Sequence, residues 1–264
     1  MYAFTYHAAT SVKDAAAQLQ KLPEANPLAG GMSLIPTMKL RLSSPGEIVD
    51  LNGLPELQGI ALANGTLTIG AMTRHAEVAA SADVQSAIPA LSELAGGIGD
   101  VQVRNRGTIG GSICFNDPAA DYPAGLVGLG ATVHTTERSI PADDFFVSLY
   151  ETALKSGEIV TSVSFPVPDM AGWSKFANLA SRFAIVAVMV SVTGSAVRVA
   201  VTGAKECVFR VTDMENALSA DFTPSAVSEI RVAVDELNDD HHAHAEYRAH
   251  LITVLAKRAI ASCG

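Results

Sequence analysis

Two glycine-rich segments are the clearest candidates for binding an anionic ligand. They are residues 29–33 (AGGMS) and residues 106–112 (RGTIGGS). Glycines at a turn let backbone N–H groups converge and let a ligand approach the chain closely, so a pyrophosphate can be held with few lysines. Each segment also places a hydroxyl beside a Gly-Gly pair, at Ser33 in the first and at Thr108 and Ser112 in the second. The pattern predicts a phosphate site, although tight turns and close helix–strand packing are the more common reasons for such glycines.

Basic residues flank both segments and favour an anion there. They are Lys39, Arg41, Arg104 and Arg106. The established phosphate motifs are nevertheless absent. A G-x-G-x-x-G motif fails because Gln102 stands in place of its last glycine, and the chain has no G-x-x-x-x-G-K-[ST] motif. A G-x-S-x-G motif around Ser33 fails at Ile35. These absences argue against a P-loop NTPase and against a nucleophile-elbow hydrolase.

Two carboxylates follow the second glycine segment, at Asp117 and Asp121. A carboxylate here can accept hydrogen bonds from the hydroxyls of a ribose or ribitol. Asp117 precedes a proline, so turn chemistry explains it at least as well. Asp121 is therefore the better candidate for a ligand contact.

Histidines and cysteines offer weaker candidates. His75 follows a predicted strand, where capping or packing is a commoner role than ligand contact. His241 and His244 are expected to share a helix face, but a solvated helix start explains them better than a metal site does. The three cysteines are Cys114, Cys207 and Cys263. They are too few and too widely spaced for an iron–sulfur cluster or a structural zinc site, and only Cys114, beside the glycines, is a candidate for reactivity.

Composition limits the class of protein. The chain has 264 residues, of which 48% are hydrophobic and 17% charged, so it can bury a large core. Its net charge of −9 argues against binding nucleic acid or an anionic membrane. No apolar run approaches the roughly 20 residues that span a bilayer, and the N-terminus has no signal-peptide pattern. Unpaired cysteines favour a reducing compartment, which we expect to be the cytoplasm.

Local patterns predict the elements that carry these residues. Residues 11–22 form an amphipathic helix capped by Ser11, and residues 47–51 form a strand, so the first fifty residues read as a small α/β unit. Asn64-Gly65 predicts a hairpin between 59–62 and 66–70. Helices are expected at 73–80 and 84–95, with a break or start at Pro89.

The remaining elements follow from apolar runs. Residues 126–134 are predicted to resume a strand, and hairpins continue to about residue 168. Strands are expected at 183–192 and 197–202, and helices at 214–218 and 224–237. A long helix at 239–260 is predicted to begin after Asn238 or Asp239. A domain boundary is expected between residues 168 and 175.

Residues 29–45 (AGGMSLIPTMKLRLSSP) and 104–124 (RNRGTIGGSICFNDPAADYPA) resemble the two FAD-binding signatures of the molybdenum hydroxylase flavoprotein subunits. This family includes the medium subunit of aerobic carbon monoxide dehydrogenase and the FAD subunit or domain of xanthine dehydrogenases and aldehyde oxidoreductases. The resemblance continues through 145–160, 175–188 and 244–259. It implies an α+β fold with a two-lobed FAD-binding domain of the p-cresol methylhydroxylase/vanillyl-alcohol oxidase type at 1–172 (lobes about 1–55 and 56–172). A small C-terminal α+β domain would occupy 173–264.

The resemblance also implies which residues bind FAD. They are Ala29, Gly30, Gly31, Met32, Ser33, Thr108, Ile109, Gly110, Gly111, Ser112, Asp121 and Leu154. The two loops would close together around the pyrophosphate, Asp121 would hold a hydroxyl, and Leu154 would lie near the flavin. The family often has His in place of Met32 and Asn in place of Ser112, which changes side-chain contacts but leaves the backbone donors. We expect Gly110→Val to leave the chain folded but without flavin.

The function implied is electron transfer. FAD would pass electrons from [2Fe-2S] clusters in a small partner subunit to an acceptor such as quinone, NAD or oxygen, while a large partner subunit would hold the molybdenum cofactor and choose the substrate. The assembly would be a heterotrimer or a dimer of heterotrimers. The substrate stays open among CO, purine, aldehyde and N-heterocycle. Two alternatives remain: a self-sufficient FAD-dependent oxidoreductase acting on a small substrate, and a non-catalytic nucleotide-binding module.

Overall fold

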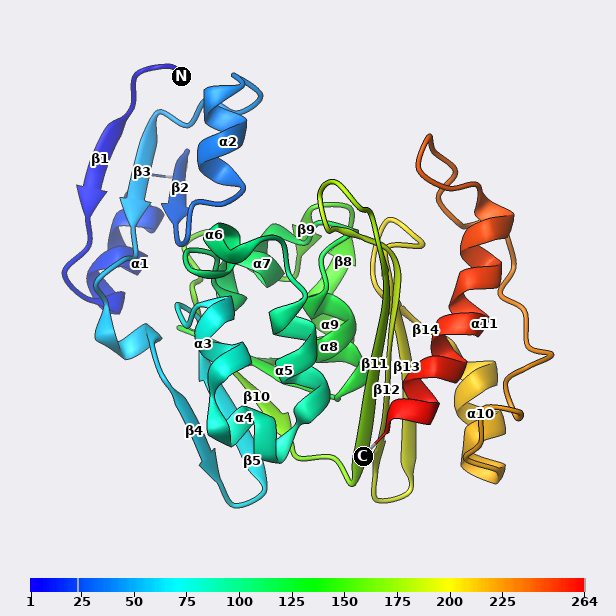
Figure 1. Cartoon of the computed structure of the whole chain (residues 1–264). Helices are drawn as coiled ribbons and strands as arrows, with labels where there is room; N and C mark the ends of the chain where they lie inside the picture. The colour runs from blue at the N-terminus through cyan, green and yellow to red at the C-terminus, as the bar shows by residue number, and fades with distance from the viewer. Residues whose placement is uncertain (23, 264) are drawn as a thin grey trace.

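A computed structural model describes residues 1–22 and 24–263. Its N-terminal unit is a three-stranded parallel sheet in the order β1-β3-β2, flanked by two helices (Figure 1). The elements are β1 (Thr5–Ala8), α1 (Val12–Lys21), β2 (Ala25–Leu28), α2 (Leu34–Lys39) and β3 (Glu47–Asp50). The Asp14 N–H donates to the Ser11 hydroxyl at 3.0 Å, which caps α1 as predicted. The predicted α/β unit is thus confirmed.

The middle of the chain surrounds a five-stranded antiparallel sheet in the order β4-β5-β10-β6-β7. Its strands are β4 (Ile60–Ala63), β5 (Thr66–Gly70), β6 (Thr132–Thr135), β7 (Ser139–Pro141) and β10 (Val160–Pro166). Asn64 and Gly65 have φ of 51° and 71°, so they form the predicted hairpin turn. A single turn, η1 (Pro55–Leu57), leads into β4.

Short helices make up most of the rest of the middle unit. They are α3 (His75–Ala80), α4 (Ala82–Ala87), α5 (Pro89–Gly96), α6 (Val101–Arg104), α7 (Ile109–Phe115), α8 (Tyr122–Gly128) and α9 (Ala142–Phe145). A small hairpin, β8 (Phe146–Ser148) and β9 (Glu151–Thr152), completes the unit. The strand predicted at 126–134 is wrong at its start, because every residue of α8 is buried and β6 begins only at Thr132. A short buried apolar run does not distinguish helix from strand by periodicity.

The C-terminal unit is a four-stranded antiparallel sheet covered by two helices (Figure 1). It contains β11 (Met170–Ala177), β12 (Ala184–Thr193), β13 (Ala196–Thr202), β14 (Phe209–Arg210), α10 (Thr212–Ala220) and α11 (Ala245–Ser262). Side chains of β12 alternate between two cores. Val186 and Val188 face the helices of this unit, whereas Ala187 and Met189 join the core of the middle unit. The sheet therefore lies between both groups of helices.

Of the predicted helices here, one is wrong and the other begins later than expected. Residues 224–237 form turns and bends, and α11 begins at Ala245 rather than after residue 239. Asp240 explains the late start, because its carboxylate accepts hydrogen bonds from the His242 and Ala243 N–H groups and from Arg248. These bonds stabilise a turn instead of a helix N-terminus. His241 consequently lies outside any helix.

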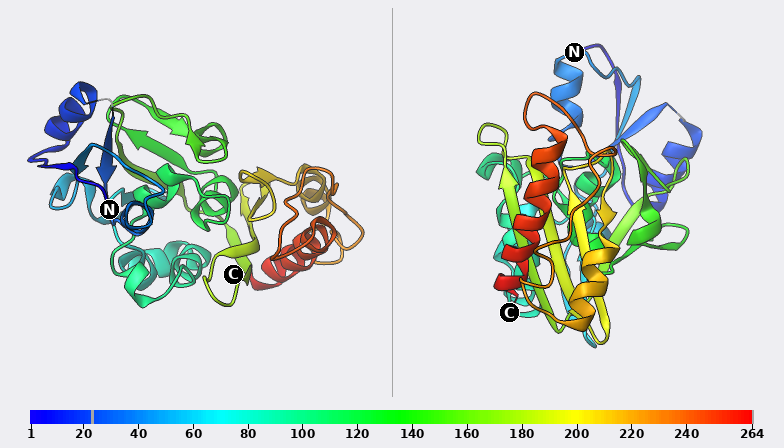
Figure 2. Two further views of the ribbon diagram at one scale, coloured as in Figure 1. Left: turned by 90° about the horizontal axis from the view of Figure 1, so that it is seen from above. Right: turned by 90° about the vertical axis from the view of Figure 1, so that its right-hand side faces the viewer.

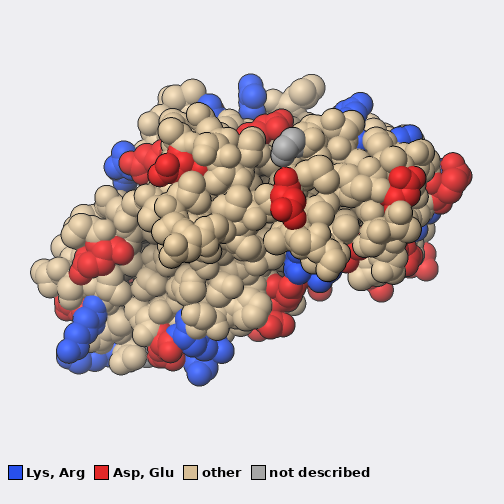
Figure 3. Space-filling model, turned by 90° about the horizontal axis from the view of Figure 1, so that it is seen from below, with Lys and Arg blue, Asp and Glu red and all other residues tan. Residues whose placement is uncertain are grey.

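The three units lie side by side, with the N-terminal unit and α11 at opposite ends (Figures 1 and 2). The predicted domain division at residue 172 falls within β11 and stays a prediction. On the face seen in Figure 3, basic and acidic residues are interspersed rather than gathered in one patch. Among the described residues, no helix is both long and apolar enough to cross a bilayer.

Candidate functional site

The two glycine segments meet backbone to backbone. A Cβ atom on Gly30 would lie 2.2 Å from the carbonyl oxygen of Arg106 and 2.8 Å from the Cα of Gly107. A Cβ on Gly111 would lie 3.3 Å from the Cβ of Ala29. The loops can approach this closely only because these positions carry no side chain. The expectation that the two loops close together is confirmed.

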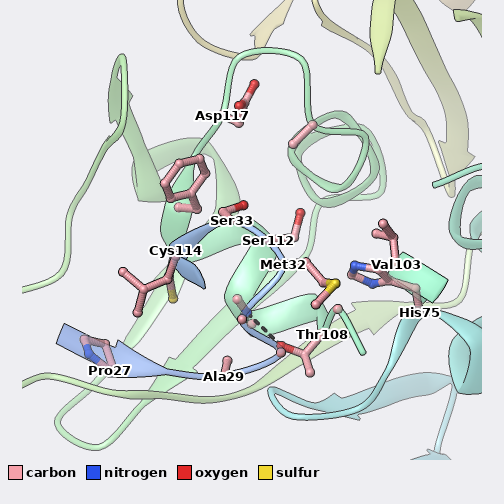
Figure 4. Close-up of a pocket in the computed structure, with 18 of the residues that line it drawn as sticks. Pro27, Ala29, Met32, Ser33, His75, Val103, Thr108, Ser112, Cys114 and Asp117 are labelled. Carbon is pink, nitrogen blue, oxygen red and sulfur yellow. Dashed lines mark hydrogen bonds between the residues drawn. The ribbon is translucent and has the colours of Figure 1, made fainter. Parts of the chain in front are cut away.

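A cavity of about 810 Å³ opens beside the joined loops. Its volume lies in the upper part of the range of about 300–1,000 Å³ that ligand sites occupy. The predicted residues that line it are Ala29, Gly30, Gly31, Met32, Ser33, Thr108, Gly110, Gly111, Ser112, Asp121 and Leu154. Figure 4 shows Met32, Ser33, Thr108 and Ser112 grouped around this space. Ile109 is the exception, since its side chain is fully buried in the core.

The first loop supplies the free backbone donors. The N–H groups of residues 30–33 donate no hydrogen bond to the described part of the chain, and Gly31 has φ of 74°, which favours glycine. The second loop differs. The Gly110 N–H donates to the Ala71 carbonyl at 2.8 Å, and the Gly111 N–H donates to the Thr108 hydroxyl at 3.1 Å. The second loop therefore contributes close packing and hydroxyls, while an anion would find its backbone donors in the first.

The flanking basic residues do not form the site as expected. None of Lys39, Arg41, Arg104 and Arg106 lines the cavity. Arg104 instead donates to the carbonyls of Ile98 (3.0 Å) and Gly99 (2.9 Å), which fixes a turn that does line it. The cation in the lining is Arg182, on the turn between β11 and β12. The glycine pattern gives no sign of Arg182, because it comes from a distant segment.

Asp121 forms a buried ion pair that the sequence did not suggest. Its Oδ2 lies 2.6 Å from Nζ of Lys175, which also donates to the Gly97 carbonyl at 3.2 Å. Burial raises the pKa of Asp121 to about 6, and the Lys175 ammonium opposes this shift. The other carboxylate oxygen, Oδ1, is buried without a hydrogen-bond partner among the described residues. Because Asp121 lines the cavity, Oδ1 is suited to accept a hydrogen bond from a ligand hydroxyl.

Other sequence candidates have structural roles. The Asp117 Oδ1 accepts a hydrogen bond from the Ala119 N–H at 2.8 Å, which is the turn chemistry considered above. Burial raises the pKa of the Cys114 thiol to about 12, so it is protonated at neutral pH, which argues against the reactivity for which it was a candidate. Among the described residues, no group of three or more His, Cys, Asp or Glu side chains is placed to hold a metal ion.

Gly110 is required for packing against the core as well as for the shape of the second loop. A Cβ there would lie 2.7 Å from both the Cβ and the carbonyl oxygen of Ala71. Ala71 is buried in the core, so a larger side chain at residue 110 would force the main chain to shift. We therefore expect Gly110→Val to destabilise the fold as well as to displace flavin, rather than to leave the fold unaffected.

The residues present fit a dinucleotide cofactor such as FAD. The first loop has unused N–H groups for a pyrophosphate. The two loops lie so close together that a Cβ on Gly30 would force them apart. Asp121 Oδ1 offers an unused buried acceptor for a sugar hydroxyl. The apolar side chains of Leu154 and Ile159 complete the lining on another side.

Comparison with known proteins identifies the family. Residues 2–168 match the family described as the FAD binding domain in molybdopterin dehydrogenase. The chain is 36% identical to the carbon monoxide dehydrogenase medium chain of Hydrogenophaga pseudoflava, over 97% of this chain and 96% of that one. It is 34% identical to the nicotine 6-hydroxylase medium subunit of Paenarthrobacter nicotinovorans, over 99% and 98%.

A solved structure agrees with this likeness. Reconstituted CO dehydrogenase from Oligotropha carboxidovorans superposes with a TM-score of 0.89 at 31% identity, over 98% of this chain and 96% of the other. The family match covers more than half of the chain, and both relatives are matched over nearly their whole length. The α+β fold and the FAD cofactor implied by the resemblance are thereby confirmed. The chain belongs to the FAD-binding medium subunits of the molybdenum hydroxylases, which are oxidoreductases.

Proposed function

We propose that this chain receives electrons from the iron–sulfur clusters of a small partner subunit and delivers them, through FAD, to an external acceptor. The observation that carries the proposal is the closed pair of glycine loops, whose first member has N–H groups with no acceptor in the described chain. When bound, FAD supplies the redox chemistry, because no protein side chain transfers electrons in this way. The chain itself binds, orients and shields the cofactor.

Each part of the cavity has a task in this proposal. The backbone N–H groups of residues 30–33 hold the pyrophosphate, and Thr108 and Ser112 add hydroxyls. Asp121 accepts a cofactor hydroxyl through Oδ1, and Lys175 holds the carboxylate in place through Oδ2. Gly111 packs against Ala29 of the first loop, while Gly110 and the buried Ile109 hold the second loop against Ala71 and the core of the middle unit.

The partners follow from the relatives and from the cysteines. The chain corresponds to nearly the full length of proteins named medium chain or medium subunit, which implies a large and a small subunit beside it. Its free cysteines, Cys114, Cys207 and Cys263, do not supply the four thiolates of an iron–sulfur cluster. We infer that the clusters and the molybdenum cofactor belong to those partners, that two heterotrimers associate, and that the assembly works in the reducing cytoplasm.

The substrate is chosen outside this chain in our proposal. Relatives with nearly equal identity, 36% and 34%, are named for carbon monoxide and for nicotine. Carbon monoxide and nicotine have no chemical group in common. A subunit that occurs with both substrates is therefore suited to a step that follows substrate oxidation, such as electron transfer.

The test uses the native complex with and without FAD. Mass spectrometry of the purified complex should find this chain with a large and a small subunit, with FAD bound to this chain. After FAD is removed, the substrate should still reduce the iron–sulfur clusters, but reduction of the acceptor should stop and should return when FAD is added back. Unchanged acceptor reduction without FAD would refute the proposed path. Turnover of a substrate by the isolated chain would instead support a self-sufficient oxidoreductase.

A further inference from the structure

His75 lines the cavity with an imidazole that has no hydrogen-bond partner among the described residues. It is the first residue of α3 and is only 4% exposed. Neither ring nitrogen is hydrogen bonded to a described residue, and Nδ1 is fully buried. A buried polar group without a partner costs free energy, so such groups in a folded protein call for a physical explanation. The main chain of His75 is satisfied, since its N–H donates to the Gly107 carbonyl at 3.0 Å.

Neighbouring residues hold the imidazole in a fixed position. The Tyr122 ring lies beside it, with 5.4 Å between ring centroids and a tilt of 47°. On the other side is the second glycine loop, where a Cβ on Gly107 would lie 2.6 Å from Nε2 of His75. Residue 107 must therefore be glycine for the ring to occupy this place. In Figure 4 the ring is directed toward the space that Met32 and Thr108 also border.

The ring is uncharged at neutral pH. Burial, together with the nearby Arg104 guanidinium, lowers the pKa of His75 to about 4. A neutral imidazole has one N–H donor and one acceptor nitrogen, so it suits an uncharged polar atom as a partner. The cavity offers room for such an atom, and Gly107 leaves the Nε2 side of the ring unobstructed by a side chain.

We propose that His75 is a cofactor-binding residue, in which a ring nitrogen on the cavity side forms a hydrogen bond with a polar atom of FAD. This inference rests on FAD binding in the cavity, and it adds a contact from α3, an element outside both glycine segments. It would give a partner to one ring nitrogen of an imidazole that is hydrogen bonded to no described residue.

Three variants of the full chain separate binding from packing. His75→Leu removes both nitrogens and keeps an apolar side chain, whereas His75→Gln keeps a polar N–H and a carbonyl. Tyr122→Phe is the matched control, because the Tyr122 hydroxyl is also buried without a partner in the described part of the chain but Tyr122 does not line the cavity. Each is freed of flavin, and two quantities are measured: its melting temperature and its Kd for FAD by flavin fluorescence.

The proposal predicts that the affinity for FAD falls while the melting temperature of the flavin-free chain does not. His75→Leu should raise the Kd by about three- to tenfold, the value of one neutral hydrogen bond, without lowering the melting temperature of the flavin-free chain. His75→Gln should recover most of the affinity. Tyr122→Phe should bind FAD like the wild type, with an unchanged or higher melting temperature.

Two results would overturn the proposal. One is an unchanged Kd in His75→Leu. The other is a lower melting temperature together with an equal loss of affinity in both His75 variants, which would assign the residue to packing. If His75→Leu does not fold, NMR spectra of the wild-type chain with ¹⁵N-labelled histidine still decide. The ring-nitrogen resonances of His75 are identified as those missing from the spectrum of His75→Gln. Added FAD should shift these resonances, and the absence of any shift would refute the contact.

Discussion

The Cα of Gly30 packs against the carbonyl oxygen of Arg106 so closely that a Cβ on Gly30 would lie 2.2 Å from that oxygen. Arg106 is held by its own hydrogen bond, since its N–H donates to the Val103 carbonyl at 3.1 Å. Neither side of this contact is the flexible end of a side chain. The contact therefore fixes the position of the first glycine loop relative to the second.

Gly30→Ala should separate the loops and abolish stable flavin binding. We expect the variant to retain little FAD after purification and to lose about 1–3 kcal/mol of unfolding free energy, which is typical of overpacking. Gly46→Ala is the matched control, because no atom lies within 4 Å of a Cβ there and its φ is not positive. Flavin absorbance per chain and thermal unfolding measure both effects. Full flavin occupancy in Gly30→Ala would show that the loop contact is not required.

Local signals in the sequence predicted the parts of the structure that depend on neighbouring residues. The Ser11 cap and the Asn64-Gly65 turn each satisfy backbone groups within a few positions, so α1 and the β4–β5 hairpin were found correctly. The glycine loops were found for the same reason. Their contact with each other depends on residues far apart in the chain, and it was expected only from the family resemblance.

The errors come from side-chain hydrogen bonds and packing contacts that the apolar periodicity of the sequence does not reveal. Asp240 was assigned to the start of a helix, but Arg248 and the turn N–H groups bind its carboxylate. Lys175 reaches Asp121, and Arg182 reaches the cavity, only because β11 packs beside the middle unit, and nothing in their local sequence indicates this. A buried helix such as α8 has the same apolar pattern as a buried strand.

Breaking the Asp121–Lys175 pair should be costly because both side chains are buried, with exposed fractions of 4% and 9%. We expect Lys175→Met to lose about 3–5 kcal/mol of unfolding free energy, since it leaves the carboxylate buried without a partner. The double variant Asp121→Asn/Lys175→Met should lose less than the sum of the single variants. Urea unfolding of the flavin-free chain at pH 8 measures this coupling, because Asp121, with a pKa of about 6, is then ionised.

An exposed pair provides the control for that cycle. Lys205 and Glu236 also form an ion pair, but the Glu236 side chain is 74% exposed. Lys205→Met should leave the unfolding free energy nearly unchanged because water screens this pair. Additive losses in the Asp121 and Lys175 variants would contradict a direct coupling between them.

Glu158 should make the chain less stable in acid. Its buried carboxylate accepts hydrogen bonds from Thr135 (2.7 Å), from Nε of Arg138 (3.0 Å) and from the Lys155 N–H (2.9 Å). Burial alone would raise the pKa of Glu158, but these bonds outweigh it and lower the pKa to about 2. Because the folded-state pKa lies below the unfolded value of 4.5, the stabilisation is present above about pH 4.5 and is lost as pH falls toward 2.

Glu158→Gln should therefore lose up to roughly 3 kcal/mol of unfolding free energy at pH 7, at 1.36 kcal/mol for each unit of pKa shift. The difference from the wild type should shrink steadily below pH 4.5, because the wild-type carboxylate becomes protonated there. Urea unfolding at a series of pH values measures the difference, and Glu56→Gln, at an exposed position, should follow the wild type throughout. A difference between Glu158→Gln and the wild type that does not change with pH would show that Glu158 acts through packing rather than through its charge.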